Sequence, residues 1–314
     1  MSALPEMTIP EVHSFEQIWD RAKAKTAGRK LRAAFIAPTD PDMVRAVARA
    51  TAEGLIDPIP IGERCAFDAV CESENIKFDS KTFIQTHDIV ASVTAAGNMA
   101  AALEIDLIIK GRLLTTDLLK ILFQSESRFL TPGKTVSHVA VLKPERYKKL
   151  LLLTDGAVVV APDLKRKLEL IGNLVKVAQA IGLPNPRVAV LAAVEVVYPQ
   201  MPVTMEAAVI SKMAERGQIK GAIVDGPLSF DVAVDMFAAH SKGVKNSQVA
   251  GQADALVAPN IETANGIYKA MALYGNCRMG GTVVGGAVPL AIGSRSDTFE
   301  GKYNCIALAV LAAK

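Results

Sequence analysis

Aromatic side chains are scarce in this sequence, at 5% of 314 residues. Because half of the residues are hydrophobic, a sizeable core must be built mainly from Ala, Val, Leu and Ile. Long aliphatic runs of that kind are typical of parallel strands that are covered by helices on both faces. The length is sufficient for about two domains of roughly 100–200 residues each.

An excess of charge of one sign is also lacking. The 35 Lys and Arg residues nearly balance the 32 Asp and Glu residues, which leaves a formal charge of +3. No basic stripe is interleaved with aromatic residues, so the sequence does not indicate a nucleic-acid partner. No segment approaches the ~18 apolar residues of a membrane span, and residues 1–25 lack the apolar core of a signal peptide. We therefore expect a soluble, cytoplasmic protein with no membrane partner.

The usual cysteine and histidine signatures are missing as well. The four cysteines form no CxxC pair, and no histidine lies near them in the sequence, which argues against a structural zinc site. We expect free thiols in a reducing compartment, and no bound metal. His138 lies in an apolar segment and is expected to be a core residue with satisfied hydrogen bonds. The cysteines are Cys65, Cys71, Cys277 and Cys305.

Several catalytic motifs are absent. There is no GxxxxGK[ST] motif, which counts against nucleotide hydrolysis, and no GxGxxG after the first expected strand, which weakens a dinucleotide-binding hypothesis. There is also no GxSxG motif and no clear Ser/His/Asp arrangement. Any catalytic site must therefore be sought in the loops of the fold.

Apolar runs alternate with amphipathic segments along the chain. This alternation predicts βαβ units, a mostly parallel sheet and two α/β domains, with residues 127–148 as the best crossing point between them. Thr39, Asp40 and Pro41 are expected to open one helix, with a capping residue and a proline in its first turn. Strands are expected at 31–37, 56–62, 105–111, 149–155, 187–193, 221–227 and 253–259, with one or two more within 282–294. Helices are expected at 88–104, 115–126, 162–183, 204–219, 229–241, 261–275 and 298–314.

In open parallel sheets, ligands bind beyond the carboxyl ends of the strands. The segment GSRSD, residues 293–297, follows the last expected strand and precedes a helix. A serine hydroxyl and an arginine at a helix N-terminus suit a phosphate or a developing oxyanion, so Ser294 and Arg295 are candidate catalytic residues. Asp297 and Glu300 have the spacing of a capping box, and plain capping is the alternative to a catalytic role for them.

Three further strand ends carry polar residues. Lys110 precedes an expected helix that Thr115 or Thr116 would cap, and it can attract an anion or simply be solvated. In VDGPLSFDVAVD (224–235), a strand ending at Asp225 is expected to lead into a Gly226–Pro227 turn against a ligand. In APNIETAN (258–265), Asn260 and Asn265 can either cap a helix or line a site.

The ordered set of these segments resembles the phosphate acetyltransferase / phosphate butyryltransferase family. The similar stretches are KGRLLTTDLLKILF, TPGKTVSHVAVL, VDGPLSFDVAV, GQADALVAPNIETANGIYKAM and AVPLAIGSRSD, and together they cover about residues 85–314. The KGxxxT and SHVAV segments are more similar to the butyryl branch than to the acetyl branch.

The resemblance implies a fold like that of isocitrate and isopropylmalate dehydrogenases, with a second domain inserted in the first. Domain 1 would comprise residues 1–140 and 287–314, and domain 2 residues 141–286, with the active site in the cleft between them. The family resemblance also implies a homodimer.

The implied reaction is the reversible conversion of acyl-CoA and phosphate into acyl phosphate and CoA, through a ternary complex, with an acetyl or butyryl group. Coenzyme A would be a substrate, and no other cofactor is implied. Ser294 and Arg295 would stabilise charge, and Asp297, or else Glu300, would take the proton of the CoA thiol. Substrate-binding residues would be Lys110, Thr116, Asp225, Gly226, Pro227, Asn260 and Asn265.

Two other hypotheses remain open from the residues. An NAD-dependent, metal-assisted dehydrogenase on the same scaffold would use Asp231 and Asp235, which are four residues apart on an expected helix, as metal ligands. A non-catalytic CoA-binding module would bind CoA tightly without turnover.

Overall fold

The protein is described by a computed structural model that covers residues 11–78, 82–124, 128–295 and 297–314. The chain divides into two compact units. The terminal unit consists of Phe15–Val136 and Gly280–Lys314, and the central unit is Ser137–Met279 with a short N-terminal piece. The central unit is therefore inserted, in sequence, between the two segments of the terminal unit. The predicted domain limits and the active-site cleft between the domains remain predictions.

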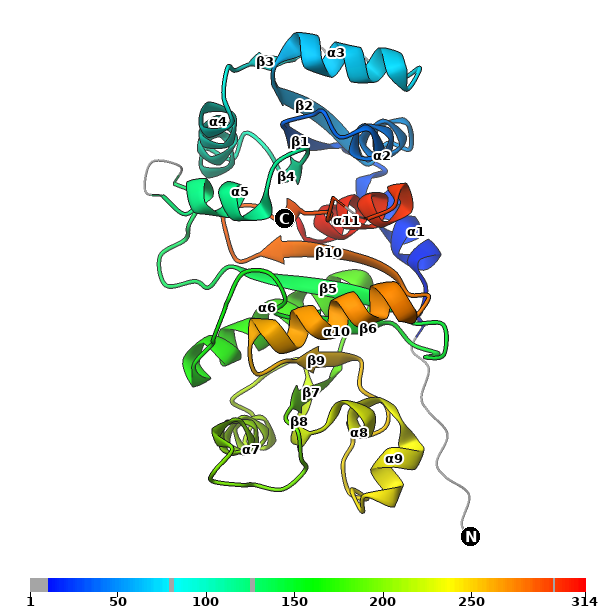
Figure 1. Ribbon diagram of the computed structural model, residues 1–314, viewed down its shortest axis with the longest axis vertical. Coiled ribbons are helices and arrows are strands. Elements are labelled where there is room, and N and C mark those ends of the chain that lie inside the picture. The colour runs from blue at the N-terminus through cyan, green and yellow to red at the C-terminus, as the bar shows by residue number, and fades with distance from the viewer. Residues whose placement is uncertain (1–10, 79–81, 125–127, 296) are drawn as a thin grey trace. The chain divides into compact units, whose positions relative to one another are not determined.

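The terminal unit is built on strands in the order β3-β2-β1-β4-β11-β10 (Figure 1). The pairs from β3 to β11 are parallel, and β10 runs antiparallel to β11. Buried apolar residues fill these strands, as in the central pair Ala33–Ile36 and Leu107–Ile109. The strands are β1 (Leu31–Ile36), β2 (Ile56–Gly62), β3 (Ile84–Gln85), β4 (Leu107–Lys110), β10 (Arg278–Val284) and β11 (Leu290–Ala291).

Helices flank this sheet. The terminal helix α11 (Phe299–Ala312) is buried along almost its whole length and contacts α2 (Pro41–Ala52) and α1 (Phe15–Thr26). Asp40 caps α2 through a hydrogen bond from Met43 N, which confirms the predicted start of that helix. The other helices are α3 (Arg64–Ser73), α4 (Ile89–Ala101) and α5 (Thr115–Leu122).

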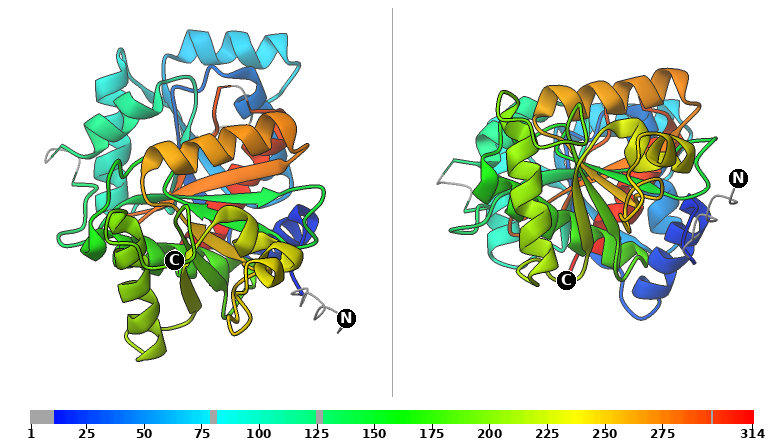
Figure 2. Two further views of the ribbon diagram at one scale, coloured as in Figure 1. Left: turned by 60° about the horizontal axis from the view of Figure 1, so that its bottom comes forward. Right: turned by 90° about the horizontal axis from the view of Figure 1, so that it is seen from below.

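The central unit has strands in the order β5-β6-β9-β7-β8. Only the β5–β6 pair is antiparallel. Helix α7 packs on β8 and β7, and α10 packs on β6 (Figure 2). The strands are β5 (Ser137–Lys143), β6 (Leu151–Thr154), β7 (Arg187–Leu191), β8 (Ile223–Leu228) and β9 (Ala255–Val257), and the helices are α6 (Leu164–Ile181), α7 (Pro202–Glu215), α8 (Phe230–Val234), α9 (Met236–Ser241) and α10 (Ile261–Tyr274).

These elements confirm the predicted α/β class with mostly parallel pairing. Two local predictions for the central unit were wrong. The expected helix 229–241 is interrupted at Asp235, whose carboxylate instead accepts a hydrogen bond from Phe237 N and caps α9. The expected Gly226–Pro227 turn lies inside β8, which continues to Leu228. Because β8 is the last strand in the order, a proline without an N–H group is tolerated there.

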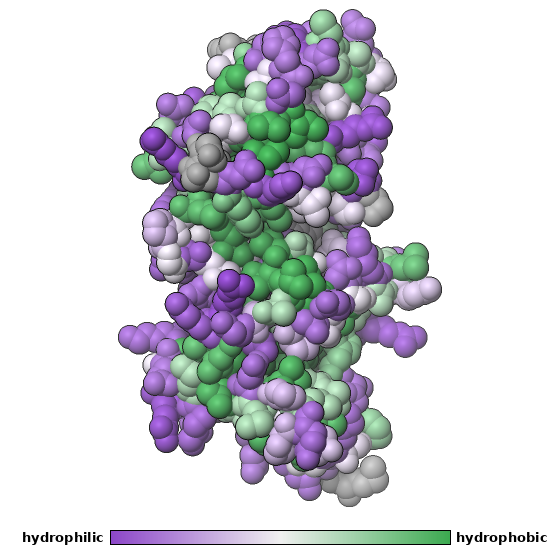
Figure 3. Space-filling view, turned by 60° about the vertical axis from the view of Figure 1, so that its left-hand side comes forward, coloured by the Kyte–Doolittle hydropathy of each residue, from purple (hydrophilic) through white to green (hydrophobic). Residues whose placement is uncertain are grey.

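The surface of the terminal unit carries exposed apolar side chains on and near α4 and α5. These are Ile89, Val90, Leu103 and Leu114, and the side of the molecule that bears α4 and α5 shows apolar areas between polar ones (Figure 3). No helix in the described part of the chain combines the length and the apolar character needed to span a membrane.

Candidate active site

The carboxyl ends of β1 and β4 meet closely in the terminal unit. Gly111 N donates to Ile36 O at 2.8 Å, and Arg112 N donates to Ala37 O at 2.8 Å. A Cβ atom on Gly111 would lie 2.0 Å from Ala37 O, so only glycine fits at this crossing. The close approach fixes the backbone that follows β4 and thereby places Lys110 at the edge of the sheet.

Lys110 is a buried cation at that edge, with 3% of its surface exposed. Its ammonium donates to Leu113 O at 3.1 Å and, weakly, to Gly111 O at 3.4 Å. Of the charged side chains that the structure describes, none forms an ion pair with it. An ammonium group has three hydrogen-bond donors and a full positive charge. Two carbonyl oxygens accept only two hydrogen bonds and do not neutralise the charge. This arrangement suits an anionic ligand.

Burial lowers the pKa of the Lys110 ammonium. The negative charge of Asp40 opposes this effect, while the positive charges of Lys302 and Arg295 add to it. Strands β4 and β11 pair in parallel, with Ala291 opposite Ile109, so the loop after β11 that carries Arg295 leaves the sheet next to Lys110. Two cations of the terminal unit are thus gathered near one strand edge, where an anion would relieve their repulsion.

The loop between β11 and α11 carries the predicted Ser-Arg pair. Ser294 is half-buried and Arg295 is exposed. Ser294 N donates to Asp297 Oδ2 at 2.7 Å, and Asp297 N donates to Ser294 O at 3.1 Å, so the loop closes on itself and presents Arg295 outward.

The capping-box alternative for this loop was wrong. Thr298, not Asp297, caps α11, because its hydroxyl oxygen accepts from Gly301 N at 3.2 Å. Asp297 is therefore left to hold the backbone of Ser294, which places a carboxylate beside the Ser-Arg pair. Glu300 lies half-buried in the first turn of α11.

The predicted threonine cap of α5 was also wrong. The N-cap residue is Leu114, with no side-chain hydrogen bond to the helix. Thr116 is exposed in the first turn of α5. Its hydroxyl is thus not required for capping.

The other predicted residues all belong to the central unit. Asp225 lies in β8, and its carboxylate accepts from Gly226 N at 2.8 Å. A Cβ atom on Gly226 would lie 2.6 Å from Val190 O, so this glycine allows β7 and β8 to approach closely. The bond between Gly226 and Pro227 is cis. This segment has clear local structural roles.

The two asparagines at the start of α10 make local hydrogen bonds. Asn260 caps the helix, and its side-chain oxygen accepts from Thr263 N at 3.0 Å and from Thr263 Oγ1 at 2.7 Å. Asn265 Nδ2 donates to Gly156 O at 3.0 Å and so ties α10 to the loop after β6. For Asn260, the capping alternative therefore describes what the side chain does here.

The metal-ligand hypothesis for Asp231 and Asp235 loses its geometric basis. Asp231 lies on α8, whereas Asp235 lies between the two helices and caps α9. Hydrogen bonds from Ser229 and Lys242 lower the pKa of the Asp231 carboxyl to about 2. Among the described residues, no group of three or more His, Cys, Asp or Glu side chains could hold a metal ion.

Some structurally important residues were not singled out from the sequence. The carboxylate of Asp155 is buried after β6 and accepts from the N–H groups of His138, Ala157 and Val158, and weakly from Val159. The strand-end sequence TDG was the available signal. His138 itself is buried on β5, as expected, with its ring edge-on to Tyr268. Lys302 is buried on α11 and gave no signal, because a lysine in the first turns of a helix, beside Glu300 and Asn304, looks like an ordinary surface residue.

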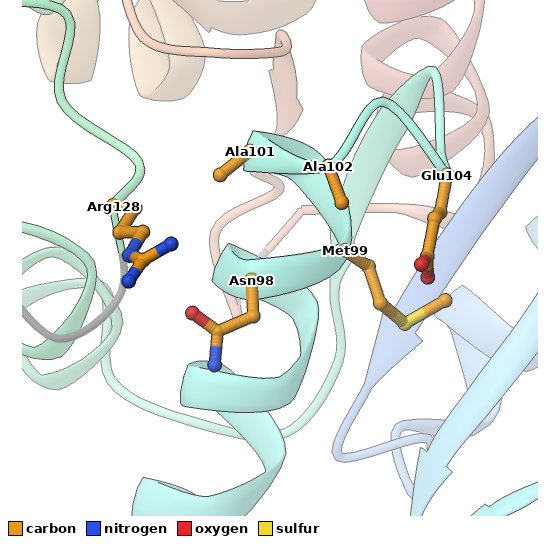
Figure 4. Close-up of a pocket in the computed structure, with 6 residues that line it drawn as sticks. All are labelled: Asn98, Met99, Ala101, Ala102, Glu104 and Arg128. Atoms are coloured by element: carbon orange, nitrogen blue, oxygen red, sulfur yellow. The ribbon is translucent and has the colours of Figure 1, made fainter.

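A separate surface pocket lies at the end of α4 in the terminal unit. Asn98 and Arg128 face each other across it in Figure 4. Its lining contains none of the predicted site residues, so it does not bear on the strand-edge site. It is lined by Asn98, Met99, Ala101, Ala102, Glu104 and Arg128.

The sequence is similar to that of one enzyme family over almost the whole chain. The profile of the family described as "Phosphate acetyl/butaryl transferase" matches residues 14–310. The chain is 39% identical to the phosphate butyryltransferase of Clostridium acetobutylicum over 96% of this chain and 99% of that protein. It is 38% identical to the phosphate acetyltransferase of Thermotoga maritima over 95% and 99% of the two chains.

Solved structures agree. The crystal structure of a branched-chain phosphotransacylase from Enterococcus faecalis V583 superposes with a TM-score of 0.75 and 29% identity, over 90% of this chain and 98% of that one. A putative 4-hydroxythreonine-4-phosphate dehydrogenase from Salmonella typhimurium shares the fold alone, with a TM-score of 0.52 and 13% identity over 90% and 100% of the two chains. The predicted dehydrogenase-like fold is confirmed, and the similarities do not favour the dehydrogenase activity.

Proposed function

The chain belongs to the phosphate acetyl/butaryl transferase family, and on this basis we propose that it interconverts acyl-CoA and phosphate with acyl phosphate and free CoA. The observation that supports this assignment of the site is that buried Lys110 and the Ser294–Arg295 loop follow adjacent parallel strands, β4 and β11, of the terminal unit. Cations and loop donors at a strand edge suit a reaction in which both substrates are anionic.

In the proposed mechanism both substrates are bound together in a ternary complex. A carboxylate takes the proton of the CoA thiol, and the thiolate attacks the carbonyl carbon of the acyl phosphate. A C–S bond forms, the C–O bond to phosphate breaks, and the electron pair leaves with the phosphate. No acyl-enzyme is formed, so the protein's main contributions are positioning and electrostatic stabilisation.

Asp297 is the proposed base, with Glu300 as the second candidate. Asp297 is held beside the Ser-Arg pair by the hydrogen bond from Ser294 N. A thiol whose pKa is near ~8.5 needs only modest assistance at neutral pH. Arg295 assists by favouring the thiolate and by stabilising the oxyanion, while Ser294 donates its hydroxyl hydrogen to the developing charge.

Lys110 is the proposed ligand of the phosphoryl group, with Thr116 nearby on α5. We also propose that residues of the central unit bind the substrates, namely Asp225, Gly226, Pro227, Asn260 and Asn265. We further propose that the enzyme is a cytoplasmic homodimer that needs no cofactor apart from CoA as a substrate.

The test is a pair of thiol assays on the purified chain. Acetyl phosphate added with CoA should consume free thiol, and phosphate added to butyryl-CoA should release it, with or without EDTA. CoA binding without turnover on either substrate would instead support a non-catalytic CoA-binding module. Nicotinamide reduction dependent on Mg²⁺ would support a dehydrogenase.

A further inference from the structure

Lys302 is a buried charge that the mechanism above does not use. It lies in the first turns of α11 with 2% of its surface exposed. Its ammonium donates to Asp40 Oδ1 at 2.8 Å and to Asp40 Oδ2 at 3.0 Å, and lies 3.7 Å from Asp42 Oδ2. The Lys302–Asp40 pair therefore connects α11 to the N-terminus of α2.

The side chain of Lys302 lies next to the loop that carries Ser294 and Arg295. A Cβ atom on Gly293 would lie 3.0 Å from Lys302 Cγ and 3.8 Å from Asp297 Oδ2. The lysine stem thus packs against the residue that precedes Ser294. Because glycine at position 293 has no Cβ atom, the Lys302 side chain can contact the loop directly.

A buried ion pair adds little stability compared with an apolar pair of the same size. Stability alone is therefore a poor reason for placing one here. Asp40 caps α2 just beyond the carboxyl end of β1, in the neighbourhood of Lys110. Without Lys302, the Asp40 carboxylate would attract the Lys110 ammonium and repel an anionic ligand.

We propose that Lys302 is a positioning residue that holds the Asp40 carboxylate and so keeps Lys110 available for the phosphoryl group of the phosphate substrate. This inference rests on the proposed function and extends it to a residue that does not touch the substrate. Lys302 acts through Asp40, and Lys110 makes the contact.

The charges around Lys110 shift its pKa in directions that can be measured. The groups that face Lys110 are Asp40 at the start of α2, Lys302 and Cys305 on α11, and Arg295 in the loop. Asp40 raises the pKa of Lys110, whereas Lys302 lowers it. Removing either charge should therefore shift the titration of Lys110, in opposite directions.

The first experiment is a charge cycle with Lys302→Met, Asp40→Asn and the double variant. In phosphorolysis of butyryl-CoA, Lys302→Met should raise KM for phosphate by about tenfold, the scale of one charged hydrogen bond, and leave KM for butyryl-CoA nearly unchanged. The double variant should return KM for phosphate to within about threefold of wild type, because the unpaired carboxylate is gone. Lys302→Arg should retain function.

A double variant no better than Lys302→Met would overturn the proposal, because lost packing alone predicts no rescue. An increase confined to KM for butyryl-CoA would also overturn it, and would assign the site to the phosphates of CoA. If Lys302→Met does not fold, the pH profile of Asp40→Asn still tests the proposal, because an alkaline limb that does not move to lower pH would overturn it.

The second experiment follows the alkaline limb of kcat/KM for phosphate. Lys302→Met should move this limb to higher pH, and Asp40→Asn should move it to lower pH, relative to wild type. Shifts in the same direction, or no shift, would contradict the proposal. A merely structural role does not predict opposite signs.

Lys149→Met is the matched control. Lys149 is a fully buried lysine paired with Asp254 in the central unit, so its loss should lower Tm without changing KM for phosphate. Thermal stabilisation by inorganic phosphate provides a readout independent of turnover.

Suppose that wild type lacks acyl transfer, but Lys302→Met reduces the phosphate-induced Tm shift and the double variant restores it. The proposed function then fails and the role of Lys302 stands. If wild type is active and the cycle shows no rescue, only the role of Lys302 fails.

Discussion

The terminal and central units follow the same plan of strands and helices, but they use the polar residues at their strand ends differently. In the central unit, Asn260 caps α10, Asn265 binds Gly156 O, and Asp155 collects backbone N–H groups. In the terminal unit, Lys110 is buried beside two backbone carbonyl oxygens without an ion-pair partner among the described residues, and Arg295 is exposed. A strand-end location alone therefore does not identify a ligand site; an uncompensated charge at that location is the stronger indication.

The largest expected effect is at Arg295 in the terminal unit. Arg295→Ala should lower kcat/KM by about 100- to 1,000-fold, because it removes a donor to the developing oxyanion. Steady-state kinetics with acetyl phosphate and CoA measure this. The control is Arg29→Ala, since Arg29 pairs with Asp106 near the opposite end of β1 and should leave kcat/KM unchanged. A loss of only a few-fold for Arg295→Ala would remove the catalytic assignment of this residue.

The next largest effect is expected at Asp297. Asp297→Asn should lower kcat by about 100-fold at neutral pH, near the low end of general-base contributions. The defect should shrink as pH rises toward the thiol pKa, because thiolate then forms without a base. Glu300→Gln is the comparison and should change kcat by less than about threefold on the same scale. A larger loss in Glu300→Gln than in Asp297→Asn would move the base to Glu300.

A smaller effect is expected in the central unit. Asn265→Ala removes a neutral hydrogen bond to Gly156 O, so kcat/KM should fall by no more than about tenfold. Kinetics under the conditions used for Arg295→Ala give a direct comparison between the units. A loss as large as that of Arg295→Ala would show that this asparagine acts on the reacting atoms and would reverse the contrast between the units.

The smallest effect on activity is expected for Glu53→Gln, at the C-terminal end of α2, which should not change activity at neutral pH. Burial acts to raise the pKa of the Glu53 carboxyl, but hydrogen bonds from Lys23, Tyr303 and Arg49 outweigh it and lower the pKa from 4.5 to about 2. A lowered carboxyl pKa stabilises the fold above the unfolded value and ceases to do so as pH falls through the folded value.

The difference in Tm between wild type and Glu53→Gln should therefore be largest above about pH 4.5 and shrink toward about pH 2. Thermal denaturation across this range measures it. Glu215→Gln, at an exposed pair with Lys212, is the control and should show little change. A difference that grows on acidification would contradict the assigned pKa direction.

The sequence was sufficient to predict much of the fold. Aliphatic runs such as LRAAFI and IDPIPIG are observed as β1 and β2, and the long helix α6 also lies within its predicted range. The helix α1 was not predicted, although Phe15, Ile18 and Ala22 form a buried stripe at helical spacing. The strand β3 has only two residues, which is too short to show the alternation of apolar and polar residues that marks a strand in the sequence.

The candidate site was predictable only in part. The positions of Ser294, Arg295 and Lys110 after strands were visible, because strand ends are defined by the apolar pattern. The roles of Asp297 and Thr298 were not, since either residue can cap a helix and only the backbone geometry decides between them. The pairing of Lys302 with Asp40 joins residues 262 positions apart and leaves no local signal.

The most direct test of the account is a calorimetric titration of inorganic phosphate into three forms of the enzyme: wild type, Lys110→Met and Asn265→Ala. If the terminal unit holds the phosphoryl group, Lys110→Met should weaken phosphate binding by about tenfold or more, while Asn265→Ala should bind phosphate like wild type. Unchanged binding by Lys110→Met, together with weakened binding by Asn265→Ala, would place the phosphate on the central unit and contradict the account.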